Sequence, residues 1–501
     1  MKKTIMKLMF IMLLYVCMTA CYEDKGNYDY TPLPEVKMEN LEESYTVTQF
    51  DTLNITPEVS LPEGNYEYSW RIWINQVNGS ESITISHEKY LAYEVLESPG
   101  NYVMVYTITN KDTQVSTYKT MQLIIQGLIT EGWLVLHEKE GKTDFDLLMS
   151  PYFSRRVTKD IELRNLYESI NGEPLPGGRG VSIANYNAGS RQYVYVLTEN
   201  AGVRLSAVTM QKMYDLSSLM VDGRPLKPQS YSWLPWGNMT HLAEMLVSDG
   251  CFYMAQFGDN LFAEPVFKDG GTYKASPYLG WWLEWTLRAV LYDELHGRFL
   301  RVANNVLTFM EFPPAPGALF DLNRMNGHLV YMEDGFNKYE YAVIQDWTTG
   351  KRTLYVINFL TEDNQYAVAL YNTDGCPEFG TANCFAVGSR GNVFYYATED
   401  KVYQYDYSGR NTASVVLEAS PGEKITCMEL MKPNEDYYVT SQPYDNKVLV
   451  IATHNETTGE GKIYMYYLNE ANGALDKSSQ KVYAGFGEII DIEYNYYKYG
   501  S

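Results

Sequence analysis

Polar and apolar residues alternate along the first part of the chain, from about residue 40 to residue 126. The alternation has a period of two and is clearest over 44–48, 66–73 and 102–108, with turn sequences rich in Gly, Pro and Asn between the runs. This pattern is typical of strands that bury one face. It predicts a two-sheet β-sandwich of the immunoglobulin type, with Trp70 in its core rather than at a ligand.

The pattern changes near residue 127. From there a turn residue repeatedly precedes a dense run of β-branched and aromatic residues, which is followed by a polar gap and a second run. The clearest pair of runs is 391–397 with 401–406, and the same pattern recurs at 446–452 with 462–467. Repeats of about 40–50 residues with four strands each are typical of β-propellers. Residues 127–501 therefore predict a propeller of about seven blades, with six or eight left open. A large sandwich or barrel is the alternative.

The N-terminus carries an export signal. Three lysines precede an apolar run over residues 8–17, which is too short to span a membrane and fits a secretory signal peptide. The run ends in Met-Thr-Ala-Cys at 18–21, which resembles a bacterial lipobox, and the acidic residues after Cys21 resemble the signals of surface lipoproteins. We expect Cys21 to carry lipid and to anchor the protein in the outer membrane, facing the cell exterior. An ordinary signal peptide is the alternative.

These patterns together predict an all-β chain in four parts. The parts are a lipoprotein signal peptide at 1–20, a lipidated tether at 21–39, a PKD-like or immunoglobulin-like β-sandwich at 40–126 and a β-propeller at 127–501.

Charge and composition exclude some functions. The formal net charge is −22, so the chain lacks the excess of Lys and Arg that a nucleic-acid binder or a polybasic membrane binder needs. Tyrosine is unusually frequent, with 45 residues in 501. No nucleic-acid partner is expected.

The cysteines do not form a metal or redox motif. Cys376 and Cys384 lie in a Gly- and Pro-containing loop of an exported protein, so a local disulfide and two free thiols are both open. Cys251 and Cys427 lie in apolar runs and are expected to be buried. No Cys-x-x-Cys occurs.

No sequence motif for catalysis is found. The nucleophile elbow, the His-Glu-x-x-His helix, the phosphate loop and the EF-hand are all absent, and the six histidines are scattered. We therefore predict no catalytic residues, no metal and no cofactor. Carboxylates are numerous enough for some pair to lie at glycosidase-like separation by chance; they include Glu284, Asp293, Glu294, Asp321, Glu333 and Asp334.

Two aromatic segments are the best candidates for a ligand site. They contribute Trp233 and Trp236, and Trp281, Trp282 and Trp285. Flat aromatic faces bind sugar rings and peptide side chains, and nearby polar groups fix the orientation of the ligand. We predict that these tryptophans line one mouth of the propeller. The alternative is that they pack between blades.

The mature N-terminus resembles a known family. Cys-Tyr-Glu-Asp-Lys-Gly-Asn-Tyr-Asp-Tyr at 21–30 is similar to the opening of the PKD-like family lipoproteins of Bacteroidota, and the passage at 131–136 is similar to theirs. The resemblance implies a surface lipoprotein that accompanies an outer-membrane importer of the starch-utilisation-system type and its lipoprotein lid. Such a protein captures a glycan or peptide nutrient without catalysis and passes it to the importer.

Two other functions remain open. A propeller can also carry a surface glycoside hydrolase, lyase or peptidase, because fold does not determine function. A purely structural subunit of the importer complex is the third possibility. A buried carboxylate pair at the mouth of the propeller would favour the enzyme, and an exposed Trp platform would favour binding.

Overall fold

The computed structural model divides the chain into two compact units, residues 1–126 and residues 127–501. The described residues are 36–74, 82–97, 99–127, 129, 131–155, 157, 159–188, 191–233, 243–256, 261–267, 270–283, 287–303, 308–361, 365–432 and 443–496. None of the helices in these ranges has the length and hydrophobicity to cross a membrane.

The first unit is a β-sandwich. Its strands are β1 (Lys37–Glu39), β2 (Ser44–Thr48), β3 (Thr52–Ile55), β4 (Glu58–Ser60), β5 (Tyr66–Ile74), β6 (Ile83–Ser86), β7 (Leu91–Glu94), β8 (Gly100–Asn110) and β9 (Ser116–Gln126). A five-stranded sheet has the order β2-β9-β8-β5-β6, and β3-β7 and β1-β4 form two-stranded sheets. Trp70 is fully buried and stacks on Tyr106 at a centroid distance of 4.2 Å, which confirms its predicted place in the core.

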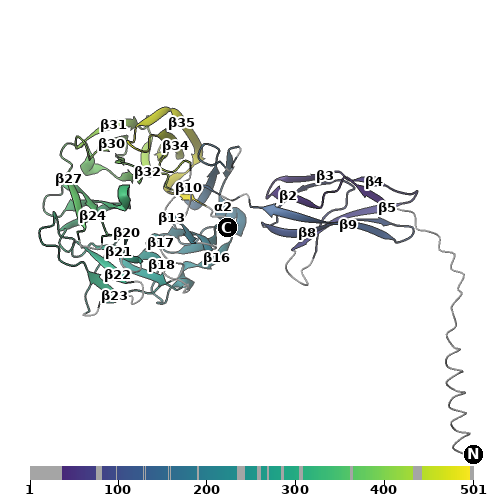
Figure 1. Cartoon of the computed structure of the whole chain (residues 1–501), viewed down its shortest axis with the longest axis horizontal. Coiled ribbons are helices and arrows are strands. Elements are labelled where there is room, and N and C mark those ends of the chain that lie inside the picture. The colour runs from purple at the N-terminus through teal and green to yellow at the C-terminus, as the bar shows by residue number, and fades with distance from the viewer. Residues whose placement is uncertain are drawn as a thin grey trace, which may run out of the picture. The chain divides into compact units, whose positions relative to one another are not determined.

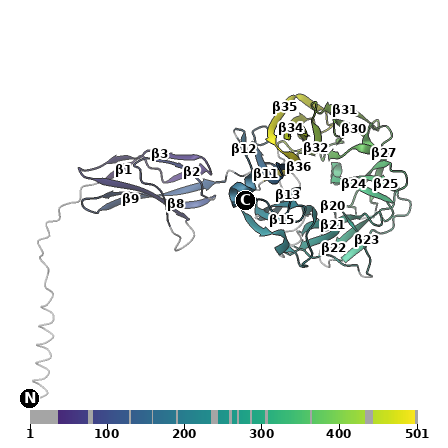
Figure 2. The same ribbon diagram turned by 180° about the vertical axis from the view of Figure 1, so that it is seen from behind.

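The second unit is a β-propeller, as the repeats predict. Its described residues form seven sheets, and Figure 1 shows them arranged in a ring with β23 (Thr308–Glu311), β27 (Ala367–Asn372) and β31 (Thr412–Glu418) on the rim. Figure 2 shows the same ring from behind. One strand of each blade contacts its counterpart in the next blade; in order these are β13 (Gly180–Ala188), β17 (Pro228–Trp233), β20 (Ala275–Leu283), β24 (Gly327–Asp334), β28 (Cys384–Val387), β32 (Lys424–Leu430) and β36 (Glu488–Asn495). These strands therefore surround the centre of the ring.

The strands fall into blades in chain order. Blade 1 contains β10 (Gly132–Lys139), β11 (Lys142–Met149), β12 (Ile161–Leu163) and β36 (Glu488–Asn495); blade 2 contains β13 (Gly180–Ala188), β14 (Arg191–Thr198), β15 (Gly202–Ser206) and β16 (Lys212–Asp215). Blade 3 contains β17 (Pro228–Trp233), β18 (Ala243–Ser248) and β19 (Cys251–Gln256); blade 4 contains β20 (Ala275–Leu283), β21 (Leu287–Asp293), β22 (Arg298–Ala303) and β23 (Thr308–Glu311).

The remaining blades follow the same plan. Blade 5 contains β24 (Gly327–Asp334), β25 (Glu340–Asp346), β26 (Arg352–Ile357) and β27 (Ala367–Asn372). Blade 6 contains β28 (Cys384–Val387), β29 (Phe394–Ala397), β30 (Lys401–Asp406) and β31 (Thr412–Glu418), and blade 7 contains β32 (Lys424–Leu430), β33 (Val448–Asn455), β34 (Glu460–Leu468) and β35 (Leu475–Phe486). The helices are short: α2 (Leu166–Asn171) and the 3-10 turns η1 (Leu216–Leu219), η2 (Phe336–Lys338) and η3 (Phe379–Thr381).

The last strand closes the ring. β36 pairs antiparallel with β10, so residues from both ends of the unit complete one sheet. A Cβ on Gly487 would lie 1.9 Å from the backbone oxygen of Glu138, so only glycine fits at this junction. Closure of this kind gives every blade a neighbour on both faces, so that no apolar blade face is left exposed at an end of the array.

Buried tyrosines explain part of the unusual composition. The apolar clusters between blades contain rings whose hydroxyls bond to backbone oxygens of turns: Tyr292 donates to Gly327 O at 2.6 Å, and Tyr396 donates to Pro377 O at 2.6 Å. A buried Tyr can fill the wide space between twisted sheets while its hydroxyl satisfies a turn carbonyl.

Cys376 and Cys384 do not form the disulfide that the sequence left open, because both thiols are free. Cys376 belongs to the apolar cluster between blades 5 and 6, and Cys384 belongs to the cluster between blades 6 and 7. The two side chains are thus buried in different inter-blade layers, so nearness in sequence does not bring the sulfurs together. Burial raises the pKa of Cys376 to about 11 and that of Cys384 to about 12.

Candidate functional site

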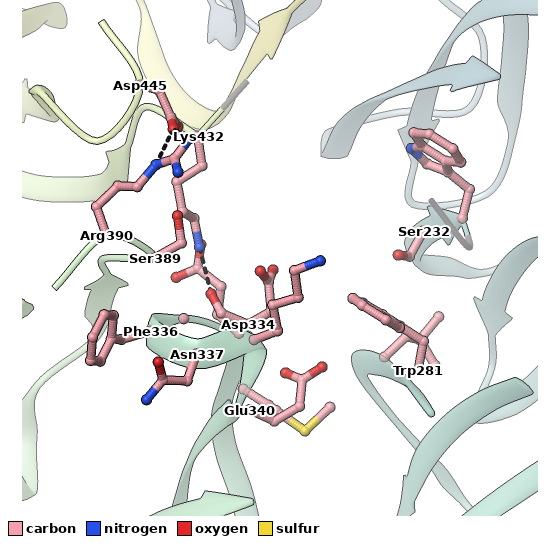
Figure 3. A pocket seen from close by; sticks show the side chains of 16 residues that line it. Ser232, Trp281, Asp334, Phe336, Asn337, Glu340, Ser389, Arg390, Lys432 and Asp445 are labelled. Atoms are coloured by element: carbon pink, nitrogen blue, oxygen red, sulfur yellow. Dashed lines mark hydrogen bonds and ion pairs between the residues drawn. The ribbon is translucent and has the colours of Figure 1, made fainter. Parts of the chain in front are cut away.

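One pocket gathers polar and aromatic side chains at the C-terminal ends of the first strands of blades 3 to 7. Its volume is about 470 Å³. We call it the Trp281 pocket; it is lined by Ser232, Trp233, Leu279, Trp281, Met332, Glu333, Asp334, Gly335, Phe336, Asn337, Lys338, Glu340, Ser389, Arg390, Lys432 and Asp445. Figure 3 shows Trp281 and Ser232 on one side of the space and Arg390, Ser389 and Asp445 on the other.

Trp281 and Glu340 form the first part of the pocket. Trp281 lies near the end of β20, is half-buried and packs partly against the core between blades 3 and 4. Glu340 begins β25 and is only 4% exposed. Its carboxyl accepts the backbone N–H of Trp281. A Cβ on Gly280 would lie 3.0 Å from Glu340 Oε1, so the glycine leaves the space that this carboxyl occupies.

Burial is the main influence on the pKa of Glu340. It raises the pKa of the carboxyl well above its usual range, and the nearby Asp334 and Glu333 add to the rise, while Lys432 and the N–H of Trp281 oppose it. Asp334 lies directly opposite Glu340 across the β24–β25 pair. Burial thus favours the neutral acid form of Glu340, and a carboxyl in that form can donate a hydrogen bond.

Lys432 connects blades 5 and 7 at the pocket. It follows β32 and pairs with the carboxylate of Glu333, and its Nζ also donates to the backbone oxygen of Asp334 at 2.8 Å. Glu333 in turn accepts the hydroxyl of Tyr331 and the N–H of Val387. The Lys432 side chain is only 9% exposed, so this ion pair is a fixed part of the wall.

A second ion pair lies on the opposite wall. Arg390 follows β28, and its Nε and Nη2 lie 2.7 and 2.6 Å from Oδ2 of the buried Asp445. Ser389 is held beside it, because its N–H donates to Asn446 Oδ1 at 2.7 Å. Blades 6 and 7 are thus joined where they line the pocket.

The turn between β24 and β25 has an unusual backbone. Asn337 and Lys338 have φ values of 62° and 59°, which non-glycine residues adopt rarely. Both side chains are exposed and line the pocket. The Asn337 amide makes no hydrogen bond within the described residues, so the turn presents it for an external partner. Strained residues of this kind gather at functional sites.

The structure places two of the five predicted tryptophans in the pocket. Trp281 and Trp233 both line it, although Trp233 is only 9% exposed and packs edge-on against Tyr186. Trp282 belongs to β20 by its backbone. Trp236, Trp285 and the lipidation residue Cys21 lie outside the described residues. Whether any of these tryptophans contacts a ligand stays a prediction.

Sequence reasoning missed Glu340, Lys432 and Arg390. Glu333 and Asp334 stood out only as two of many carboxylates. The sequence does contain a signal for these residues, namely their position relative to the strands. Each of them follows or begins a strand at the same end of its blade, so an alignment of the repeats strand by strand would have placed these polar residues together. The described residues contain no group of three or more His, Cys, Asp or Glu arranged for a metal ion.

Comparison with known proteins identifies the first part of the chain. Residues 21–178 match the model of the PKD-like family, so the match covers the sandwich and runs into the first blade. None of the curated proteins matches the chain.

Several solved structures are similar to the chain at low sequence identity. A quinonprotein alcohol dehydrogenase-like protein from Bacteroides thetaiotaomicron VPI-5482 is 15% identical, with a TM-score of 0.47 over 90% of this chain and 96% of that chain. AztD from Citrobacter koseri is 11% identical, with a TM-score of 0.35 over 86% and 98%. The dihydro-heme d1 dehydrogenase NirN is 9% identical, with a TM-score of 0.39 over 77% and 72%. At these values the likeness says nothing about activity.

Proposed function

We propose that the protein is a surface lipoprotein whose propeller binds a glycan or peptide nutrient in the Trp281 pocket, without catalysis, and assists its delivery to an outer-membrane importer of the starch-utilisation-system type. The observation that carries the proposal is Trp281 itself. Its half-buried indole faces a pocket of small-ligand size, with polar groups of four other blades around it.

The N-terminus supports the location. The PKD-like match begins at residue 21, where the lipobox predicts cleavage and lipidation. A lipid on Cys21 would leave both folded units outside the membrane, facing the exterior. Replacing Cys21 by Ala should therefore release the protein from the membrane fraction, and protease treatment of intact cells should degrade the wild-type protein.

Binding is tested by substituting Trp281. We expect Trp281→Ala to weaken binding by about 2–4 kcal/mol, as for a central aromatic contact. The matched control is Trp347→Ala, because Trp347 is 42% exposed and lies outside the pocket lining. Affinities are measured by titration calorimetry with the ligands that bind in a panel of oligosaccharides and short peptides. Equal affinities for wild type and Trp281→Ala would refute the assignment of the pocket.

A second candidate is a surface glycoside hydrolase or lyase. It is favoured by one observation: the pocket holds the buried Glu340, whose pKa is raised well above its usual range, together with Glu333, which is paired with Lys432. A buried carboxyl with a raised pKa is suited to act as a general acid. Chromatography of oligosaccharides after incubation with the protein tests it. Cleavage that is lost in Glu340→Gln would favour this candidate over non-catalytic binding.

A further inference from the structure

We propose that the Trp281 pocket selects an uncharged sugar residue of a glycan, with the ring of the sugar on the Trp281 indole and its hydroxyls bonded to Glu340, Asn337 and the serines of the pocket. This inference rests on the proposed function and deepens it, because it chooses between glycan and peptide and excludes charged ligands.

The first argument is the internal matching of charge. The lining contains four acids and three bases, and each base has an acid beside it: Lys432 pairs with Glu333, Arg390 pairs with Asp445, and Lys338 interacts with Asp334. Only Glu340 lacks a base of its own.

The matching has a consequence for ligand choice. The other three acids of the lining match its three bases, and burial favours the neutral form of Glu340, so the pocket has little net charge although the whole chain carries −22. An anionic or cationic ligand would have to break an existing ion pair or lose its hydration without a new partner, which is unfavourable in a partly buried site. A neutral ligand meets neither obstacle.

The second argument is the kind of polar group that remains. Asn337 offers an amide donor and acceptor, Ser232 and Ser389 offer hydroxyls, and Glu340 offers an acid O–H. These groups come from blades 3, 5 and 6, and Figure 3 shows Ser232 and Glu340 on the side of Trp281 and Asn337 and Ser389 across the space from it. A sugar presents an apolar face and a rim of hydroxyls, so it matches an aromatic platform ringed by such groups.

The third argument is the space made for Glu340. A side chain at position 280 would meet both Glu340 Oε1 and Met332 Cε, at 3.0 and 3.1 Å. The glycine therefore allows the carboxyl to reach the Trp281 N–H and stay at the floor of the pocket. A carboxyl held there in its acid form can accept from the protein with one oxygen and donate to a ligand hydroxyl with the other.

The experiment compares ligands that differ in charge. Wild-type protein is screened against neutral hexose and pentose oligosaccharides, oligogalacturonates, glucosamine oligomers and peptides of two to six residues, and hits are titrated by calorimetry. We expect a neutral oligosaccharide to bind at least tenfold more tightly than any charged probe. Trp281→Ala should weaken that binding at least 30-fold, and Trp347→Ala should leave it unchanged.

Two variants of Glu340 test its part. Glu340→Gln keeps a neutral side chain that can accept from the Trp281 N–H and donate to a ligand, so the affinity for the neutral glycan should stay within about threefold. Glu340→Ala removes both bonds and should weaken binding at least tenfold. Circular dichroism of each variant establishes that it is folded. A Gln variant that binds as poorly as the Ala variant would overturn the assigned role of the acid O–H.

The outcomes separate the two proposals. If a charged glycan or a peptide binds most tightly and Trp281→Ala abolishes its binding, the choice of an uncharged sugar is wrong while the proposed nutrient site stands. If no probe binds, or if binding is indifferent to Trp281→Ala, the proposed site itself is wrong and this inference falls with it.

Discussion

Asp491 makes the stability of the propeller depend on pH. It lies on β36, the strand that closes the ring, and its Oδ2 accepts the N–H of Ile183 on blade 2 at 2.9 Å. Burial raises the pKa of this carboxyl from 3.8 to about 6, and the hydrogen bonds from Ile183, Ser182 and Ile492 only partly offset the rise. The native protein therefore keeps a proton on Asp491 over a range in which the unfolded chain has lost it.

The sign and size of the effect follow from proton linkage. Below about pH 4 the carboxyl is protonated in both states, and between pH 4 and 6 only the native state holds the proton, so the free energy of unfolding falls as pH rises. A tenfold change in proton affinity corresponds to about 1.4 kcal/mol, so the rise to about 6 corresponds to roughly 3 kcal/mol, lost by about pH 7.

The substitution Asp491→Asn removes this titration. We expect the free energy of unfolding of the variant, relative to wild type, to rise by about 3 kcal/mol between pH 4 and pH 7.5. Urea denaturation followed by tryptophan fluorescence measures it, because seven of the nine tryptophans lie after residue 127. The control is Asp346→Asn. Hydrogen bonds from Thr349 and Thr348 lower the pKa of Asp346, so its carboxyl titrates mainly below pH 4 and the relative stability of this variant should stay nearly constant between pH 4 and pH 7.5.

A relative stability of Asp491→Asn that is the same at pH 4 and pH 7.5 would refute the reasoning. It would mean that the carboxyl at the ring closure titrates as it does in water. If the relative stability of Asp346→Asn also rose between pH 4 and pH 7.5, the reasoning would be refuted as well. The pH dependence would then come from the removal of a negative charge in general and not from the burial of Asp491.

Two further predictions concern the closure and the pocket wall. Gly487→Ala should lower the free energy of unfolding by about 3 kcal/mol, because its Cβ would meet the backbone of Glu138 and not a side chain that can move aside. The control is Gly380→Ala, which should leave the melting temperature unchanged because a Cβ at this position meets nothing within 4 Å. Lys432→Met should destabilise the protein by about 3 kcal/mol in urea denaturation, because it leaves Glu333 without its partner; an unchanged midpoint would show that the ion pair contributes nothing.

The fold could be predicted because its signals are local and repeated. Alternation of period two identifies strands that bury one face, and the buried Trp70 lies where that alternation places it. The propeller followed from the recurrence of aromatic runs, since each blade buries its faces only against its neighbours. The state of Cys376 and Cys384 could not be predicted, for the opposite reason. Their spacing of eight positions does not indicate which inter-blade layer receives each thiol.

The site could be predicted only in part, because its residues meet through closure of the ring. Trp281 stands out in the sequence because it lies in a segment dense in tryptophan, and the structure places it at the pocket. Glu340 is not conspicuous in the sequence, because the rise in its pKa comes from burial and from Asp334 across the strand pair, and because its carboxyl occupies the space left by Gly280. Lys432 lies almost a hundred residues further on, yet it bonds to the backbone of Asp334. The ion pairs of the pocket thus form only when the ring brings different blades together. In the sequence they become visible only if the repeats are aligned by the ends of their first strands.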